Sequence, residues 1–171
     1  NLYLKNSVIY GNTVTTSSGN NIRLAYDRNN QEYKIENCVI AYGNSDLVRV
    51  SSDGTYTGTK LTITGTDQTA GPDSCTLFLN QGKWFDTGES PTPSALWISN
   101  SNMNAEVSIE KTIFKCDQTS SGLNYLAIYQ SATNSPTYSI KDTIFDQTGS
   151  NCYLGIYSAQ QWDRVTFYSG N

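Results

Sequence analysis

An all-β fold made of stacked coils is predicted by three features of this 171-residue sequence. A short unit with the pattern YSIKDTIF (138–145) recurs along the chain, and a second strand-like segment recurs out of phase with it. In both segments apolar and polar residues alternate with period two, which indicates strands, and we find no 3.6-residue helical period. Repeats of about 20 to 50 residues are typical of solenoids, in which each repeat forms one coil.

Each YSIKDTIF-like unit has an apolar residue, two polar positions, a small or β-branched residue, and a closing Ile or Phe. Leu4 and Ile35 are 31 residues apart, as are Ile109 and Ile140. We interpret each unit as two strands, B and C, joined by a tight bend and facing the core on alternate residues. The copies are YLKNSVI (3–9), YKIENCVI (33–40), VSIEKTIF (107–114), YSIKDTIF (138–145) and the divergent WDRVTF (162–167).

The second recurring segment is expected to form strand A of each coil, separated from its neighbours by polar turns. One region, around 56–94, is irregular: Leu77–Leu79 is assigned to strand A, and the long loop Gly82–Ser94 follows it without a clear strand B. The residues that we expect to anchor strand A in the core are Leu24, Val50, Leu79, Ile98, Ile128 and Ile156.

This order of strands A, B and C resembles the right-handed parallel β-helix of the pectate-lyase-like superfamily over nearly the whole chain. The resemblance implies a single domain, residues 1–171, of about six to seven coils stacked about 4.8 Å apart. The chain opens inside a strand-like segment without a signal peptide, and neither end shows a capping helix. We therefore expect a segment of a longer solenoid, or ends that associate with other subunits. Lyases, hydrolases, adhesins and viral spikes share this architecture, so the fold alone does not define the function.

Composition narrows the class of protein. The net charge of −4 argues against a nucleic-acid-binding surface, and no apolar run approaches the 18 or so residues of a membrane span. Histidine is absent, which removes the commonest general base and metal ligand. Abundant Asn, Ser, Thr and Gly are typical of an extracellular or cell-surface protein. The lack of any N-x-Ser/Thr sequon favours a prokaryotic or viral origin.

The four cysteines form an even set, which raises the question of disulfides. Stacking places Cys75 and Cys152 three coils apart, too far for a bond. Cys38 occupies an inward position and is expected to be a buried free thiol. Cys116 and Cys152 lie at adjacent levels on either side of one corner, so they could form a disulfide. The spacings fit no CxxC metal motif.

The outward face of strand A is the candidate binding surface, because saccharides usually lie along that sheet in proteins that this chain resembles. Arginines pair with carboxylates and aromatic rings stack on sugars, so an acidic polysaccharide or surface glycan is the ligand to expect. Alternatively, these residues merely decorate a solvated sheet. Trp84, in the long loop, either overhangs this face or packs back on the irregular coil. The candidate residues are Arg23, Arg49, Phe78 and Trp97 in one column, Tyr129 and Tyr157 in the column two residues on, and Trp84.

Asp27 and Asp53 follow strand A at equivalent positions in successive coils. Such a pair could bind Ca²⁺, act as an acid/base pair, or simply belong to turns; no other cofactor is expected. The superfamily's recognisable catalytic motifs are missing. We therefore expect a non-catalytic segment for adhesion, glycan contact or a rigid stalk. The alternatives are a polysaccharide lyase or glycoside hydrolase, and a subunit of an extracellular filament or sheath that associates end to end.

Overall fold

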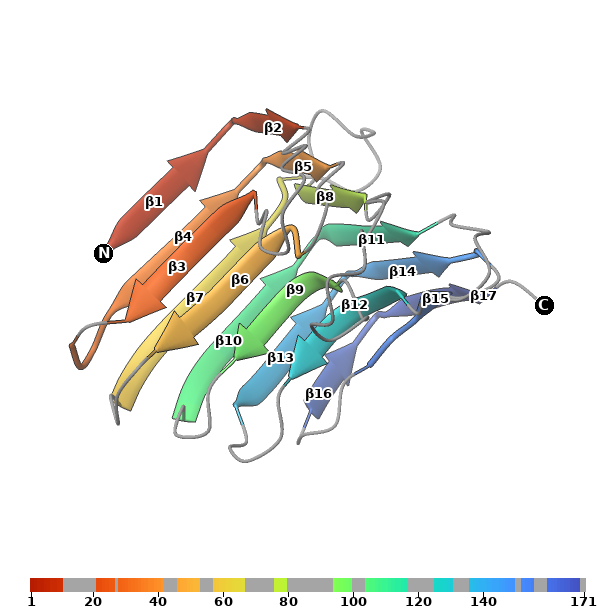
Figure 1. Cartoon of the computed structure of the whole chain (residues 1–171). Helices are drawn as coiled ribbons and strands as arrows, with labels where there is room; N and C mark the ends of the chain where they lie inside the picture. Colours follow the sequence, from red (N-terminus) through yellow and green to blue (C-terminus); the bar gives the residue numbers. More distant parts are fainter. Residues whose placement is uncertain are drawn as a thin grey trace, which may run out of the picture.

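The computed structural model describes residues 1–10, 21–26, 28–41, 46–52, 57–66, 76–79, 94–99, 104–116, 125–130, 136–149, 152–155 and 160–169. Its regular elements are all strands, and they form a parallel β-helix (Figure 1). Each strand pairs in parallel with the strand three places further along the chain, which is the pairing that a coil of three strands requires. None of the described residues belongs to a helix long and apolar enough to cross a membrane.

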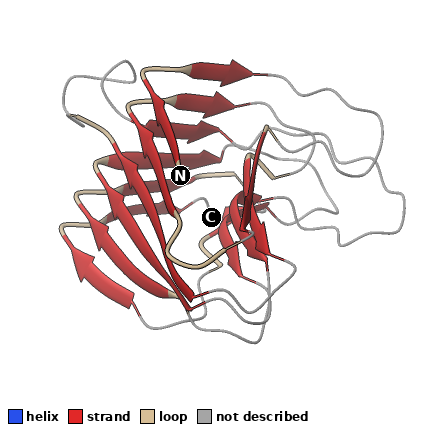
Figure 2. Cartoon of the chain, turned by 90° about the vertical axis from the view of Figure 1, so that its left-hand side faces the viewer, coloured by secondary structure: helices blue, strands red, loops and turns tan. Residues whose placement is uncertain are grey.

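Three all-parallel sheets run along the stack and face a common core (Figure 2). Sheet I holds the B strands: β1 (Leu2–Lys5), β4 (Glu32–Glu36), β7 (Thr57–Thr64), β10 (Asn104–Glu110), β13 (Thr137–Lys141) and β16 (Gln160–Asp163). Sheet II holds the C strands: β2 (Val8–Tyr10), β5 (Val39–Ala41), β8 (Thr76–Leu79), β11 (Thr112–Cys116), β14 (Ile144–Gln147) and β17 (Thr166–Ser169). Sheet III holds the A strands: β3 (Ile22–Tyr26), β6 (Val48–Ser52), β9 (Ser94–Ser99), β12 (Tyr125–Gln130) and β15 (Cys152–Tyr153).

The core consists of apolar columns, because alternate residues of every strand point inward and the strands stack in register. In sheet I the expected column of Leu4, Ile35, Ile109 and Ile140 is confirmed, with Ile63 of β7 as a further member. Its four middle members, from Ile35 to Ile140, are at most 1% exposed. In sheet II the rings of Phe114, Phe145 and Phe167 form a parallel stack, with centroids 5.0 and 5.4 Å apart.

The bend between strands B and C is left-handed at five coil levels, with φ between 46° and 51°. Asn and Asp tolerate this conformation better than most residues. At the N-terminal end the Asn37 amide donates to the Asn6 side-chain oxygen at 2.9 Å. At the C-terminal end Arg164 instead pairs with Asp142, whose pKa is thereby lowered. The residues at this bend are Asn6, Asn37, Lys111, Asp142 and Arg164.

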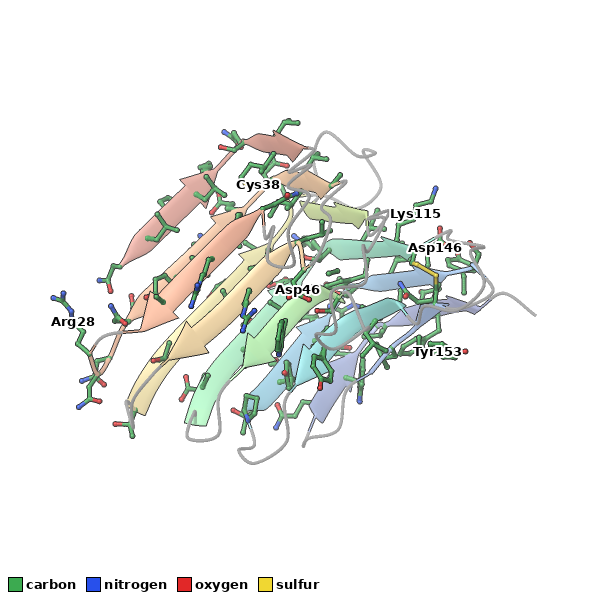
Figure 3. The ribbon with its side chains drawn as sticks, in the orientation of Figure 1. Arg28, Cys38, Asp46, Lys115, Asp146 and Tyr153 are labelled. Carbon is green, nitrogen blue, oxygen red and sulfur yellow. A yellow bond between two sulfur atoms is a disulfide. The ribbon has the colours of Figure 1, made fainter. Side chains whose placement is uncertain are left out.

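The described cysteines agree with the sequence-based interpretation, in which one adjacent pair can form a disulfide and one thiol is buried and free. Cys116 at the end of β11 and Cys152 at the start of β15 form a disulfide, with their Cα atoms 6.0 Å apart (Figure 3, yellow bond). Cys38 is a buried free thiol whose Sγ donates to the Glu36 carbonyl at 3.2 Å. Burial raises the pKa of this thiol. Cys75 lies outside the described residues.

The irregular coil is assigned differently from the sequence-based expectation. Strand β7 supplies the B strand that the sequence did not reveal, and it pairs with β4 and β10. The segment Leu77–Leu79, expected in strand A, belongs to β8 in sheet II and pairs with β5 and β11. The expectation was wrong because an insertion separates β7 from β8, whereas the other described coils have only a short bend there.

Candidate functional site

Four side chains lie in one column on the outward face of sheet III. Because Leu24, Val50 and Ile128 point into the core, their neighbours on the strand point outward. Strand pairing sets Arg23 beside Arg49, Arg49 beside Trp97, and Trp97 beside Tyr129. We call these four residues the Arg–aromatic column: Arg23, Arg49, Trp97 and Tyr129.

Three side chains of the Arg–aromatic column contact one another in series: Arg49, Trp97 and Tyr129. The guanidinium carbon of Arg49 lies 3.8 Å from the centroid of the Trp97 ring. The Trp97 and Tyr129 rings are 5.6 Å apart at their centroids and tilted by 45°. Arg49, Trp97 and Tyr129 are partly buried, whereas Arg23 is exposed. A cation over an indole face is a favourable electrostatic contact, so Arg49 is held in a defined position.

The column carries cationic groups that no described carboxylate neutralises at close range. Neither Arg23 nor Arg49 forms an ion pair with a described residue. The Nε–H of Arg49 and the Nε1–H of Trp97 are shielded from solvent and have no acceptor in the described part of the chain. This face can therefore attract an anion while its rings offer apolar faces.

A buried carboxyl group lies behind the column and was not singled out from the sequence. Asp46 precedes β6, is 1% exposed, and lies among the central strands in Figure 3. Its Oδ1 accepts from the backbone N–H and the hydroxyl of Ser94, while its Oδ2 has no partner among the described residues. Burial raises the pKa of Asp46 to about 6, and the nearby Arg49 opposes that shift.

A signal for this buried pair exists in the sequence. Asp46 lies four residues before the anchor Val50, and Ser94 lies four residues before the anchor Ile98. The two anchors pair in the structure, so aligning the strands on them places Asp46 level with Ser94.

The structure places two of the proposed binding residues differently from the sequence-based expectation. Phe78 lies in β8 of sheet II, in register with the buried Ile40 and Phe114, and not in the column with Arg49. Tyr129 pairs with Trp97, so it belongs to the first column and not to one two residues on. A shift of two residues keeps the same face outward, which is why the face was predicted correctly and the pairing was not.

Four other candidates are not placed. Trp84, Tyr157, Asp27 and Asp53 lie outside the described residues. Within the described residues, no group of three or more Cys, Asp or Glu side chains is arranged to hold a metal ion.

A second surface feature lies on the outer face of sheet I. This hollow of about 590 Å³ crosses β10, β13 and β16 and is lined by polar side chains that include Glu106, Ser108, Ser139 and Gln161. The one ring in its lining, Tyr138, is 2% exposed and points into the core. The hollow offers neither an exposed aromatic face nor a cation, so the Arg–aromatic column is the stronger binding candidate.

Comparison of the chain with family models, with curated proteins and with solved structures finds no significant match. The architecture is therefore established by the strand pairing, and the inferred function depends on the geometry of the site.

Proposed function

We propose that this chain is a non-catalytic segment of an extracellular or surface-displayed parallel β-helix that contacts acidic glycans through the Arg–aromatic column. The observation that supports this most directly is the Arg49 guanidinium lying over Trp97, with Tyr129 and Arg23 on either side. The proposal retains the resemblance to the pectate-lyase-like superfamily, in which saccharides usually lie along this sheet.

The column has the shape that an extended polymer needs. Four side chains on four adjacent strands span about 14 Å at a strand spacing of about 4.8 Å. Two of them supply positive charge for carboxylates, and two supply rings that can stack on sugar faces. A linear acidic polysaccharide lying along the stack would contact all four.

Asp46 is the described carboxyl group closest in sequence to the Arg–aromatic column, and its position does not suit catalysis. A general acid or base must come within hydrogen-bond reach of its substrate. Asp46 is 1% exposed, and one of its oxygens is occupied by Ser94. We therefore assign Asp46 to the structure of the site. The Cys116–Cys152 disulfide supports an oxidising location, as expected for an extracellular protein.

The test is a binding assay on acidic and neutral polysaccharides, with immobilised polyuronates as the first probe. The wild-type chain should bind polyuronates, and Trp97→Ala should weaken binding at least tenfold, because stacking surface and the Arg49 support are lost together. Arg49→Gln should lower affinity for the acidic polymers more than for neutral ones. Arg164→Gln removes the same charge at the far end of the stack and should leave binding unchanged.

Two outcomes would contradict the proposal. The first is an absence of binding by the wild-type chain to every acidic polysaccharide tested. The second is equal binding by wild type and Trp97→Ala, which would move the contact away from the column. Release of unsaturated or reducing sugars by the wild-type chain would instead support the lyase or hydrolase alternative.

A further inference from the structure

Two contacts join the beginning of β6 to the beginning of β9, one inside the fold and one on its surface. Inside, the carboxyl group of Asp46 accepts from the backbone N–H and the hydroxyl of Ser94. On the surface, three residues further along the chain in each case, the Arg49 guanidinium lies over the Trp97 ring. The same two strands therefore hold a buried carboxyl group behind the cation of the Arg–aromatic column.

The polar groups at these two contacts are only partly satisfied. The Oδ2 atom of Asp46, the Nε–H of Arg49 and the Nε1–H of Trp97 are all shielded from solvent and have no hydrogen-bond partner in the described part of the chain. Shielded groups interact in a medium of low dielectric constant, where water screens their charges weakly. A change in the charge of Asp46 is therefore transmitted to Arg49 with little screening.

Asp46 has one charged neighbour among the described residues that act on it. These are Ser94 on β9, with its hydroxyl and backbone N–H, the backbone of Asp46 itself, and the Arg49 guanidinium on β6. Burial raises the pKa of Asp46 to about 6, and Arg49 opposes that shift. The carboxyl group consequently gains or loses its charge close to neutral pH, directly behind the candidate binding surface.

We propose that Asp46 makes the Arg–aromatic column pH-sensitive, so that the column binds an acidic glycan more tightly when Asp46 is protonated than when it is ionised. An ionised Asp46 offsets part of the positive charge that Arg49 presents to the ligand, and it repels the carboxylates of the ligand. A protonated Asp46 does neither. This pH dependence presupposes the glycan contact proposed above and adds its regulation. By linkage, a bound polyanion raises the pKa of Asp46 by the same factor by which protonation strengthens binding.

The test is binding of the wild-type chain to immobilised polyuronate at a series of pH values between about 5 and 8, on either side of the pKa of Asp46. Affinity should rise about fivefold or more as the pH falls through this range. Asp46→Asn should bind as tightly as the protonated wild type at every pH. Because this variant meets the same polymer, a slope caused by the ligand's own carboxylates would remain in it. Asp146→Asn removes a carboxylate from the outward face of β14 in sheet II and should keep the wild-type profile.

A second measurement does not depend on any variant. Heteronuclear NMR of the Asp46 carboxyl group gives its pKa in the wild-type chain, free and saturated with an oligouronide, and the bound value should be the higher one. Binding that is equal at every pH, a slope that persists in Asp46→Asn, or an Asp46 pKa that binding leaves unchanged would overturn the pH sensitivity and leave the glycan contact standing. An absence of binding at every pH would overturn the glycan contact, and the pH sensitivity with it.

Discussion

Asp46 and Ser94, 48 residues apart in the sequence, form a buried pair at the start of two neighbouring A strands. The Oδ1 atom of Asp46 accepts from the Ser94 hydroxyl at 2.7 Å and from its backbone N–H at 3.1 Å. The other carboxyl oxygen has no partner among the described residues. Burial therefore raises the pKa of this carboxyl from 3.8 to about 6, despite the two hydrogen bonds and the nearby positive charge of Arg49.

This raised pKa predicts that stability falls as the pH rises from about 4 to about 6. In that window the folded chain retains a proton on Asp46 that the unfolded chain has released, so the unfolding free energy decreases with pH. A pKa difference of about two between the folded and unfolded chains corresponds to about 3 kcal/mol over the window. Urea denaturation at a series of pH values would measure it.

Asp46→Asn should remove this slope and be no less stable than the wild type at a pH of about 7.5, because no charge is then buried. Asp163→Asn, at an exposed position of the last coil, should keep the wild-type slope. The contribution of Glu36 to the unfolding free energy has the opposite pH dependence and changes at lower pH. Hydrogen bonds from Lys34, Lys5 and Tyr3 lower its pKa from 4.5 to about 2, so its contribution is present above pH 4.5 and is lost as the pH falls towards 2. A slope between about pH 4 and 6 that persists in Asp46→Asn would assign the titration to another group.

The Cys116–Cys152 disulfide is predicted to contribute about 4 kcal/mol to stability. It closes a loop with a sequence separation of 36 residues, and the loss of chain entropy in the unfolded state gives a value of this size. The double variant Cys116→Ser, Cys152→Ser should therefore melt at a much lower temperature than the wild type under non-reducing conditions. With a reductant present, the two proteins should melt at similar temperatures.

Cys38→Ser provides the control for that experiment. Ser7, Thr112 and Thr143 hold the equivalent position in other coils, and each donates its hydroxyl to the carbonyl two residues earlier. A serine at position 38 can make the same bond, so stability should change little and the effect of reductant should remain. A reductant effect that disappears in Cys38→Ser would contradict this assignment of the thiols.

Gly155 occupies a position that should not accept a side chain. Its φ of +79° is unfavourable for other residues, and an added Cβ would lie 2.4 Å from the carbonyl oxygen of Ile128. Gly155→Ala is expected to cost about 1–3 kcal/mol of unfolding free energy. Ser108→Ala, on the exposed face of β10, should change stability by less than about 0.5 kcal/mol. Thermal denaturation of the two variants side by side would show the difference, and equal melting temperatures would refute the expectation.

The architecture could be predicted from the sequence because one chemical pattern marks every regular coil. The apolar residues at Ile35, Ile109 and Ile140 must share a face, since a strand alternates with period two and stacked coils keep register. The outward placement of Arg49 and Trp97 follows from the same alternation. Neither conclusion needs any contact beyond the repeat itself.

The remaining features could not be predicted because they depend on where insertions fall. Long insertions in surface loops cost little free energy, so the chain can lengthen the connection between β7 and β8 without disturbing the stack. The Leu77–Leu79 segment then lost the spacing that would have identified it as strand C. In sheet III a shift of two residues preserves the inward face, so apolar alternation could not decide whether Tyr129 pairs with Trp97.

The stack of phenylalanines in sheet II predicts a graded response to removal of a ring. Phe145 is fully buried, with Phe114 on one side at 5.0 Å and Phe167 on the other at 5.4 Å. Phe145→Ala should cost about 3–5 kcal/mol, because the transfer free energy of the ring is lost and a cavity remains between two coils. Phe167→Ala removes the same ring from a position that is 55% exposed, so it should cost clearly less. Urea denaturation of both variants would measure the contrast. Equal losses would show that the last coil is packed as tightly as the interior, contrary to the exposure of Phe167.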